Sequence, residues 1–447
     1  MALLQTLGHM IGQSCLLASL SWDEQVMSAV RIFPPGLIMI LCLGGRPGFA
    51  EPPQPSGHWP QFRGPTRDLI STDTGLLANW PESGPPLRWK AGSLGEGYSS
   101  VSVVDGRIYT QGHIAGQEKL LVLDEETGQL IWSVPIGPAV QVGYSGSRCT
   151  PTVVGERLYM ETTGGDVVCL DANTQQVIWR RHLIEDFDGR MRNWGFGESL
   201  LIDGDRVVCT PGSPTSAMVA LGRGDGRVLW KVGSPDVLHA SYATPIVIET
   251  GSVRQYVQYF RSGLMGVAAE SGRILWREQA SVNQYANISS PVYREGFLFS
   301  ASAYRTGGAL FKLVQQAEGV ASELVYETKH MKSHHGGFVL VDGHIYGTDE
   351  AILTCLEFQT GQRKWRDRSV GKGAVVYADG HIYLRSEEGE VALVRATPEG
   401  YQEAGRFSQP DRSDRPAWPY PVVTGGQLYL RDQDNLLCYD LRGKTRN

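Results

Sequence analysis

Seven short segments of the chain are rich in aromatic, amide, histidine and arginine side chains, the types that hold ligands. They cover residues 95–100, 143–150, 190–199, 238–244, 283–290, 332–337 and 415–420. Nine of their residues are our candidates for ligand binding: Arg148, Asn193, Trp194, Glu198, His239, Tyr242, Asn287, His334 and His335. Glu198 and Asn287 offer oxygen atoms to a cation or a polyol, aromatic rings can stack on a flat ligand, and Arg148 can neutralise an anion. The alternative is that these side chains satisfy backbone groups and ordered water along a channel.

His334 and His335 also suggest a metal site, but adjacent residues of a strand point to opposite faces, so both rarely ligate one ion. A third ligand is not evident either. The sequence has no G-x-S-x-G elbow, HExxH motif or phosphate-binding glycine loop. We therefore assign no catalytic residue, and no metal ligand except Glu198 and Asn287 if the ion is calcium.

The elements that must position these residues repeat along the chain. After Ser99, the stretches SSVSVV and RIYTQG alternate in polarity around an Asp-Gly turn, and KLLVLD, the turn EETG and QLIWSV follow. This pattern predicts an antiparallel hairpin extended by two further strands. The repetition of such four-stranded sheets in tandem predicts a β-propeller, in which the sheets stack radially as blades. The seven segments then enter the innermost strands and face the central channel, where loops on a rigid scaffold can hold a site.

Each fourth strand carries one aromatic residue that we expect to pack against the neighbouring blade. These residues are Trp89, Trp132, Trp179, Trp230, Trp276, Tyr326, Trp365 and Phe407. The tail after Phe407 supplies three strands, and PPLRWKA around Trp89 supplies a fourth, so both termini close the last blade. We predict an all-β, eight-bladed β-propeller over residues 86–447, preceded by an extended segment over residues 51–85.

The spacing A/L-x-D-x-x-T-G-x-x-x-W is complete from Asp124 to Trp132 and partial from Asp171 to Trp179 and from Thr360 to Trp365. It resembles the repeat of pyrroloquinoline-quinone (PQQ) dehydrogenases, over residues 59–441. The stretch HWPQFRGPTRD, which starts at His58, is similar to the start of many exported bacterial PQQ-binding-like propellers. The quinone-dependent branch of this family implies PQQ with Ca²⁺, held by a Glu, an Asn and an Asp. Another branch, the propeller lipoprotein of the outer-membrane barrel-assembly machinery, binds proteins and carries no quinone.

The sequence departs from the quinone-dependent branch in two ways. It lacks the pair of adjacent cysteines that lies over the cofactor, and the segments between its blades are short, whereas the dehydrogenases bury the quinone under inserted loops. Two functions stay open. One is an exported scaffold that binds a protein or carbohydrate ligand, and the other is a quinoprotein oxidoreductase that uses PQQ and calcium on an alcohol or sugar. The departures favour the scaffold.

The first fifty residues differ in character from the rest. Arg31, the apolar run over residues 37–43 and the small-residue end at Ala50 form a signal-peptide pattern that starts at Met27. Residues 1–26 are then an upstream extension, consistent with a start codon assigned too early. The apolar run is too short to span a bilayer. We therefore predict cleavage after Ala50, a periplasmic or extracellular protein, and no membrane span.

Composition limits the partners further. The chain has 41 Lys and Arg against 47 Asp and Glu, a net charge of -6, so it offers no long basic face for nucleic acid. We also expect the protein to be a monomer. The cysteines beyond Ala50 have no CxxC spacing, so we expect buried thiols and leave one disulfide open. They are Cys149, Cys169, Cys209, Cys355 and Cys438.

Overall fold

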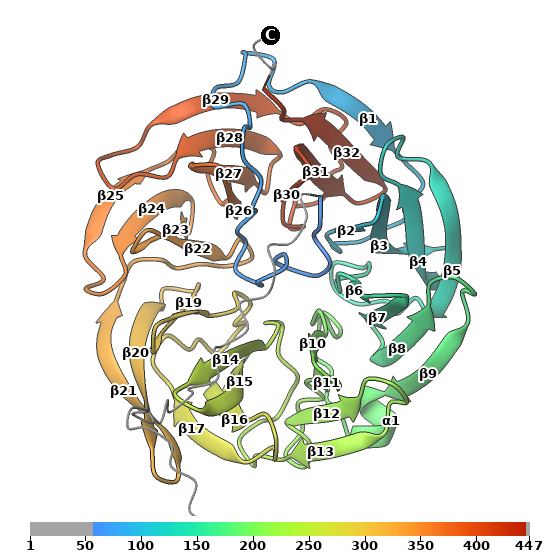
Figure 1. The fold of residues 1–447 in the computed structure, drawn as a ribbon, viewed down its shortest axis with the longest axis vertical. Coiled ribbons are helices and arrows are strands. Elements are labelled where there is room, and N and C mark those ends of the chain that lie inside the picture. The colour runs from blue at the N-terminus through green and yellow to red at the C-terminus, as the bar shows by residue number, and fades with distance from the viewer. Residues whose placement is uncertain (1–56, 444–447) are drawn as a thin grey trace, which may run out of the picture. The chain divides into compact units, whose positions relative to one another are not determined.

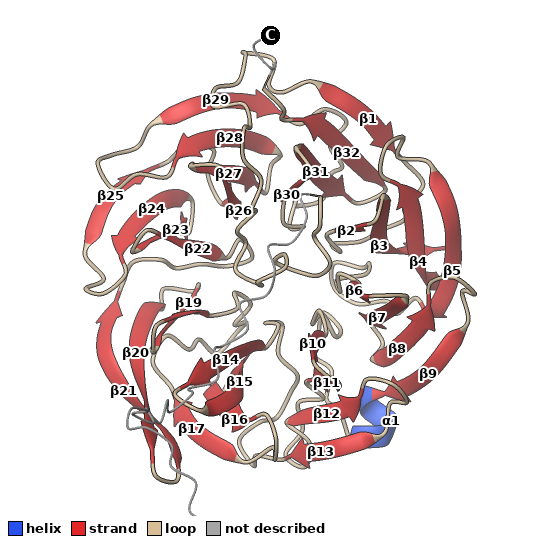
Figure 2. Ribbon diagram, in the orientation of Figure 1, coloured by secondary structure: helices blue, strands red, loops and turns tan. Residues whose placement is uncertain are grey.

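The computed structural model describes residues 57–443, so the predicted upstream extension and signal peptide over residues 1–50 lie outside the described residues. The described chain forms eight four-stranded antiparallel sheets that stand radially as the blades of a ring (Figures 1 and 2). This arrangement confirms the prediction of an all-β, eight-bladed β-propeller. The only helix in this part of the chain is the short α1 (Leu183–Phe187), which follows the outer strand of the second blade.

Each blade runs from an inner first strand to an outer fourth strand. Blade 1 contains β2 (Ser102–Val104), β3 (Arg107–Ile114), β4 (Gln117–Asp124) and β5 (Leu130–Pro138), and blade 2 contains β6 (Thr152–Val154), β7 (Arg157–Glu161), β8 (Asp166–Asp171) and β9 (Val177–His182). Blade 3 contains β10 (Leu201–Asp203), β11 (Arg206–Cys209), β12 (Met218–Gly222) and β13 (Val228–Val232), and blade 4 contains β14 (Ile246–Thr250), β15 (Val253–Phe260), β16 (Gly263–Ala268) and β17 (Ile274–Glu278). Blade 5 contains β18 (Val292–Arg294), β19 (Phe297–Ser302), β20 (Gly307–Gln316) and β21 (Gly319–Thr328), and blade 6 contains β22 (Phe338–Val341), β23 (His344–Asp349), β24 (Ile352–Glu357) and β25 (Arg363–Asp367). Blade 7 contains β26 (Gly373–Ala378), β27 (His381–Ser386), β28 (Glu390–Arg395) and β29 (Glu403–Ser408).

Blade 8 is built from both ends of the propeller. Its inner strands are β30 (Val422–Thr424), β31 (Gln427–Asp432) and β32 (Asn435–Asp440), and its outer strand is β1 (Leu87–Ala91). The register places Trp89 opposite Cys438. The segment around Trp89 therefore supplies the missing fourth strand, as the sequence predicts, and the pairing covers an edge that would otherwise be exposed.

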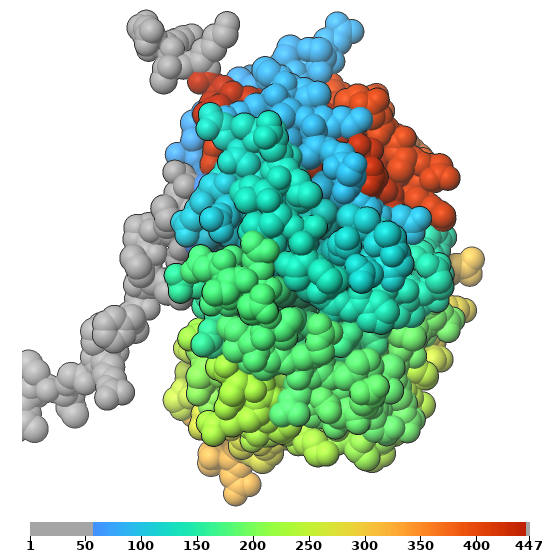
Figure 3. Space-filling view, turned by 90° about the vertical axis from the view of Figure 1, so that its right-hand side faces the viewer, coloured from blue at the N-terminus to red at the C-terminus, as the bar shows by residue number. Residues whose placement is uncertain are grey.

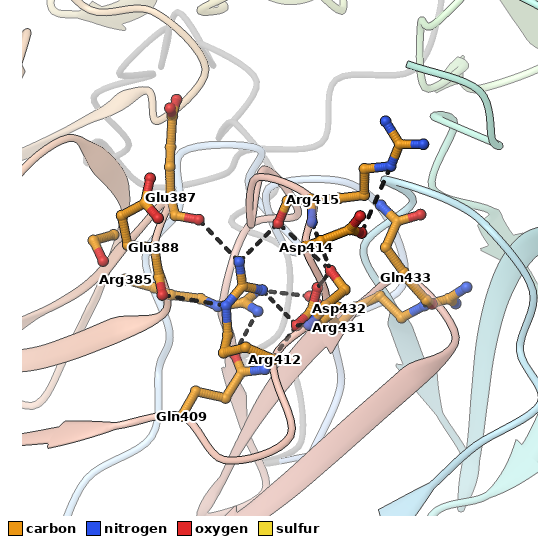
Figure 4. Close-up of polar contacts among 12 residues, drawn as sticks. Arg385, Glu387, Glu388, Gln409, Arg412, Asp414, Arg415, Arg431, Asp432 and Gln433 are labelled. Carbon is orange, nitrogen blue, oxygen red and sulfur yellow. Dashed lines mark hydrogen bonds and ion pairs between the residues drawn. The ribbon is translucent and has the colours of Figure 1, made fainter.

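Buried arginines reinforce this closure (Figure 4). Arg431 of blade 8 is 1% exposed and donates from Nη1 to Thr110 Oγ1 of blade 1 at 2.8 Å. Arg385 of blade 7 donates from Nη1 to the carbonyl of Arg431 at 2.6 Å. Asp432 pairs with Arg412, which comes from the segment between blades 7 and 8. These bonds join the last two blades to the first.

The outer aromatic residues lie at the seams between blades. The Nε1 of Trp179 in blade 2 donates to the carbonyl of Arg223 in blade 3 at 3.0 Å, and a Cβ added at Gly226 would lie 2.7 Å from the Trp179 ring. The same bond to the next blade recurs from Trp89 to Glu125 (3.1 Å), Trp230 to Ala269 (2.9 Å), Tyr326 to Phe358 (2.8 Å) and Trp365 to Thr397 (2.7 Å). Each of these five seams thus joins a ring on one blade to a turn on the next.

The acid-Thr-Gly motif forms the turn that receives this ring. Asp124 Oδ1 accepts from the Thr127 backbone at 2.8 Å and from its hydroxyl at 2.7 Å, which fixes the turn between β4 and β5. Gly128 has φ +71° and its Cα lies under the Trp89 ring, where a side chain would collide. Glycine is needed here both for the backbone conformation and for the close approach.

Three outer aromatics make other contacts. Blade 5 has the long hairpin β20–β21 where other blades have a turn, and Trp276 bonds to Gln255 Oε1 of its own blade at 2.6 Å. Trp132 packs on the apolar cluster between blades 1 and 2. Phe407 lies against Gly84, which precedes β1.

Residues 57–86, which precede β1, cross one end of the central channel, as the blue segment of Figure 1 shows. Trp59 pairs with β2, Arg63 donates to the carbonyl of Pro291 at 3.4 Å, and Ile70 pairs with β26. These contacts reach blades 1, 5 and 7, on different sides of the channel. The segment therefore closes the channel from one face of the ring.

Figure 3 turns the ring onto its edge and shows the side formed by the segments coloured blue to green. The five cysteines of the described part are all buried and free, so burial is confirmed and the disulfide left open is not formed there. Within residues 57–443, no helix has the length and apolar character needed to cross a membrane.

Candidate functional site

The other mouth of the channel holds a pocket of about 250 Å³. Phe62, from the segment that crosses the channel, lines its inner end and packs edge-on against Tyr420 with ring centroids 5.2 Å apart. Its walls are aromatic, formed by Tyr98, Tyr144, Trp194, Tyr242, Tyr304 and Trp418. No aspartate or glutamate lines it.

The strand order explains why these side chains meet. Because neighbouring strands are antiparallel, the segments that enter each first strand and the connections between second and third strands reach the same face of the ring. The turns between third and fourth strands, including residues 124–128, reach the opposite face. The acid-Thr-Gly motif therefore lies away from the pocket.

Trp418 is the centre of an aromatic cluster on one side of the pocket. Its ring stacks on His335 with centroids 4.1 Å apart and planes inclined by 20°, and it meets Tyr98 and Tyr144 at 4.8 Å each, at steeper angles. These contacts fix the ring orientations, because offset-stacked and edge-to-face arrangements are the favourable ones for such pairs.

Arg148 is the only residue of the pocket lining that carries a fixed charge. Its guanidinium donates to the backbone carbonyls of Gly146 at 2.8 Å and Tyr144 at 2.6 Å, and it lies 5.6 Å from the centroid of the Tyr98 ring. None of the carboxylates in residues 57–443 pairs with it. Burial lowers the pKa of Arg148. The guanidinium therefore has no carboxylate of the described chain in direct contact, although the charge of the buried Glu118 acts on it.

A row of hydroxyl groups joins the segments that enter the inner strands of blades 1 to 4. The backbone N–H of Ser100 donates to Thr150 Oγ1 at 3.2 Å, that of Thr150 to Ser199 Oγ at 2.9 Å, and that of Ser199 to Thr244 Oγ1 at 3.0 Å. All four residues line the pocket. Thr150, Ser199 and Thr244 use their hydroxyl oxygens as acceptors and donate to no partner within the described residues, so three O–H groups stay available to a ligand.

A second polar group contains His334, His335, Lys372 and Glu387. Lys372 Nζ lies 2.7 Å from His334 Nδ1 and 3.0 Å from Glu387 Oε1, and His335 Nδ1 lies 3.5 Å from the same Glu387 oxygen. Burial, with help from His335 and Lys372, lowers the pKa of His334 to about 3, and burial also lowers that of His335. Burial alone would raise the pKa of Glu387, but His335 and Lys372 outweigh it and bring the value to about 2.

The premise that His334 and His335 point to opposite faces of a strand is wrong. Both lie in the loop before β22, their ring centroids are 3.9 Å apart, and their nitrogens lie within 4.8 Å of a Glu387 oxygen. The Lys372 ammonium, however, already occupies the position between His334 and Glu387 that a metal ion would take. We conclude that the Lys372 ammonium is the cation that holds His334 and Glu387 together.

Lys372→Met offers a direct test of that conclusion. Removing the ammonium takes a positive charge from His334, so we expect its pKa to rise from about 3 towards the ordinary range of histidine. The titration of ¹⁵N-labelled histidines by NMR measures the change. Lys329→Met, outside the group, should leave it unaltered, and an unshifted His334 in Lys372→Met would contradict the assigned role.

The structure brings five of the nine predicted residues into the pocket lining: Arg148, Trp194, Tyr242, His334 and His335. Asn193 is exposed, with its carbonyl accepting from Gly143 N at 3.3 Å, and His239 is half-buried; neither lines the pocket. Glu198 and Asn287 are buried and do not line it.

The described residues do not fit the calcium-bound quinone of the dehydrogenase branch. Calcium takes six to eight oxygen ligands, whereas the pocket lining has no carboxylate. Asn287 Oδ1 accepts from the backbone and side chain of Asn283 at 3.0 Å each, and its Nδ2 donates to two carbonyls. Glu198 points into the wall between blades, where Gln258 Nε2 donates to it at 3.0 Å.

Sequence reasoning missed part of the pocket and of the polar group beside it. Tyr98, Tyr144, Trp418 and Lys372 all lie in segments that enter a first strand, so their position in the repeat was an available signal. Tyr304 and Glu387 lie between second and third strands, and only the antiparallel order brings them to this mouth.

The fold defines an eight-bladed propeller built from PQQ-type repeats. A sequence model of the family described as "Outer membrane protein assembly factor BamB" matches residues 55–187 and 116–367, more than half of the chain. The chain belongs to this family. The BamB of Yersinia pestis is 24% identical over 238 residues, 50% of this chain and 53% of that protein, and the BamB of Salmonella typhimurium is 24% identical over 181 residues, 39% and 40% respectively. The chain thus spans about half the length of the curated relatives that it matches.

Solved structures share the architecture. The crystal structure of BamB from Moraxella catarrhalis aligns with a TM-score of 0.57 and 14% identity, over 78% of this chain and 95% of that one. Quinohemoprotein alcohol dehydrogenase from Comamonas testosteroni aligns with a TM-score of 0.59 and 10% identity, over 87% and 81%. At such identities, these similarities establish the fold alone.

Proposed function

We propose that the chain is an exported scaffold that binds a partner protein with the face on which the pocket opens. The observation that carries the proposal is the composition of this mouth: tyrosine, tryptophan and arginine, with no acid in the pocket lining. These are the residue types enriched at the centres of protein interfaces, where lysine and acids are depleted. Several rings are exposed to a partner, with Tyr285 62%, Tyr144 45% and Tyr304 41% accessible.

The relatives support a scaffold role of this kind. Those from Yersinia pestis and Salmonella typhimurium are named outer membrane protein assembly factors, and we propose that the partner of this chain is likewise a protein of the exported compartment. In this proposal, residues 27–50 direct export, the chain is cleaved after Ala50, and residues 51–85 and the propeller of residues 86–447 act as a monomer. The alternative, a quinone-dependent oxidoreductase, is disfavoured because the pocket lacks the oxygen ligands for calcium.

Photocross-linking in the native host tests the docking face. A photoreactive phenylalanine analogue at Tyr285 should give one discrete adduct with a partner, because that side chain is 62% exposed at the mouth. The matched control is Leu130, which is 53% exposed but lies on the outer strand β5. Mass spectrometry identifies the adduct. Equal yields from the two positions, or no adduct at the mouth, would contradict the proposal.

A further inference from the structure

We propose that the recess beneath this mouth is a binding site for an acidic sugar, a pyranose ring that carries a carboxylate or a sulfate. This inference goes beyond the binding of a partner protein, because it assigns a small ligand to the pocket itself. It rests on three features of the pocket: what it donates, how its rings are oriented and how large it is.

The pocket offers hydrogen-bond donors without negative charge. Arg148 supplies a guanidinium with no carboxylate partner, and the O–H groups of Thr150, Ser199 and Thr244 have no acceptor within the described residues. Charge-assisted bonds from arginine to an oxyanion are among the strongest that a site can make. A ligand that brings an oxyanion and further oxygen acceptors therefore matches these groups.

The charge around the mouth has the same sign. Arg192 lies 5.9 Å from the centroid of the Tyr242 ring, and Arg261 bonds to the neutral Gln284 at 3.0 Å. Neither pairs with a carboxylate among residues 57–443. Glu387, the acid that the same mouth contains, is paired with Lys372 and His335, so the charges left without a partner in the described chain are those of Arg148, Arg192 and Arg261. In a chain with a net charge of -6, this local excess of unpaired cations favours an anionic ligand.

The orientation of the rings favours a sugar over a flat aromatic acid. Trp194 and Tyr242 are inclined by 48°, and Trp418 is inclined by 37° to Tyr98 and by 59° to Tyr144. The nearly parallel pair on this wall, Trp418 and His335, is stacked at 4.1 Å and leaves no gap for a third ring. Such walls form no slot for a planar molecule, whereas a pyranose presents separate C–H patches and hydroxyl groups in several directions.

The size of the pocket points to a single ring. Its volume of about 250 Å³ lies below the range of roughly 300–1,000 Å³ typical of sites for drug-sized ligands. The inner end is closed by Phe62 and the outer end opens at the mouth. One sugar unit therefore fits inside, with its glycosidic oxygen towards solvent, as the end of an oligosaccharide chain would be.

The test compares three sugars on the mature protein by isothermal titration calorimetry and ligand-observed NMR. They are methyl β-glucuronide, glucose 6-sulfate and neutral methyl β-glucoside. We expect at least one anionic sugar to bind about tenfold or more tighter than the glucoside, with an affinity that falls as salt increases. Whichever anion binds more tightly identifies the carboxylate or the sulfate as the natural group. Equal binding of all three sugars, or binding of none at millimolar concentration, overturns the proposal.

Arg148→Met removes the charge but keeps most of the side-chain stem. We expect it to remove the preference for the anionic sugar over the neutral glucoside. Arg227→Met, an exposed arginine at the turn on the opposite face, is the matched control and should behave as the wild type. Because Arg148 also bonds to its own loop, thermal unfolding checks that the variant is folded, and the wild-type comparison stands without it.

Competition experiments separate this proposal from its alternatives. Displacement of the sugar by free PQQ or by an acidic peptide, with equal affinity, would mean that the pocket recognises any organic anion, and the assignment to a sugar would fail. The cross-linking at Tyr285 is independent of these measurements. Loss of the sugar site and loss of the protein-docking face can therefore be told apart.

Discussion

Gly226→Ala is expected to lower the free energy of unfolding by about 2–4 kcal/mol, a large effect for one methyl group. Gly226 has φ +68°, where any other residue is strained by about 1 kcal/mol. The new Cβ would also lie 2.7 Å from the Trp179 ring of the preceding blade. That ring is held by its bond to Arg223 O and by the core between blades 2 and 3, so it cannot move without loosening the seam.

Gly204→Ala is the matched control for backbone strain. Gly204 is in the same blade, with φ +58°, but its added Cβ would meet nothing within 4 Å. It should cost only about 1 kcal/mol. In a Trp179→Ala background, Gly226→Ala should also fall to that smaller cost, because the colliding ring is gone. Urea unfolding followed by far-ultraviolet circular dichroism measures all four variants. Equal costs for Gly204→Ala and Gly226→Ala in the wild-type background would show that the seam contact is unimportant.

The architecture was predictable because one repeated motif contains both residues of the contact between blades. These are the turn glycine, which lies against a ring of the previous blade, and the aromatic residue, which packs on the next blade. The acid-Thr-Gly turn forms locally, through the bonds between Asp124 and Thr127. Its glycine lies against a ring of the previous blade. A local signal therefore reports a contact between sheets. Where a long hairpin replaces the turn, the predicted contact is not made: blade 5 has the hairpin β20–β21, and Trp276 bonds within its own blade.

The candidate site was less predictable, because its residues meet through chain topology. The position before each first strand could be read from the repeat, and it led to Arg148, Trp194 and Tyr242. The direction in which each side chain points could not be predicted from the repeat. Gly197 and Ser199 line the pocket, while Glu198 between them points into the wall, since successive side chains of an extended segment face opposite ways.

Glu198 instead forms a buried pair with Glu161 of blade 2. The two residues are 2% and 1% exposed, and the Glu198 backbone N–H donates to Glu161 Oε1 at 3.2 Å. Glu198 Oε1 and Glu161 Oε2 have no hydrogen-bond partner, which is costly for charged oxygens in a protein interior. A proton held by the pair would remove one of these charges and supply a donor.

Burial raises the pKa of Glu198 to about 8, although the Thr210 hydroxyl, the Arg67 charge and the Gln258 amide act in the opposite direction. Burial, followed by the charge of Glu198, also raises the pKa of Glu161. Between about pH 4.5 and pH 8, the folded protein thus holds a proton that the unfolded chain releases. The stabilisation is complete below the unfolded pKa and is lost as the pH rises towards the folded one, by about 1.4 kcal/mol per pH unit for each proton.

Glu198→Gln is therefore expected to make the protein less sensitive to alkaline pH. The amide has the shape of the protonated acid and can donate to Glu161 without releasing a proton, so the variant should match the wild type near pH 5 and exceed its stability at pH 8. Urea unfolding across that range should show a slope shallower by about 1.4 kcal/mol per pH unit. Glu388→Gln, at an exposed carboxylate, is the matched control and should keep the wild-type slope. Parallel pH profiles for Glu198→Gln and the wild type would mean that the buried pair is ionised in the folded protein, with its charge balanced by Arg67 rather than removed by a proton.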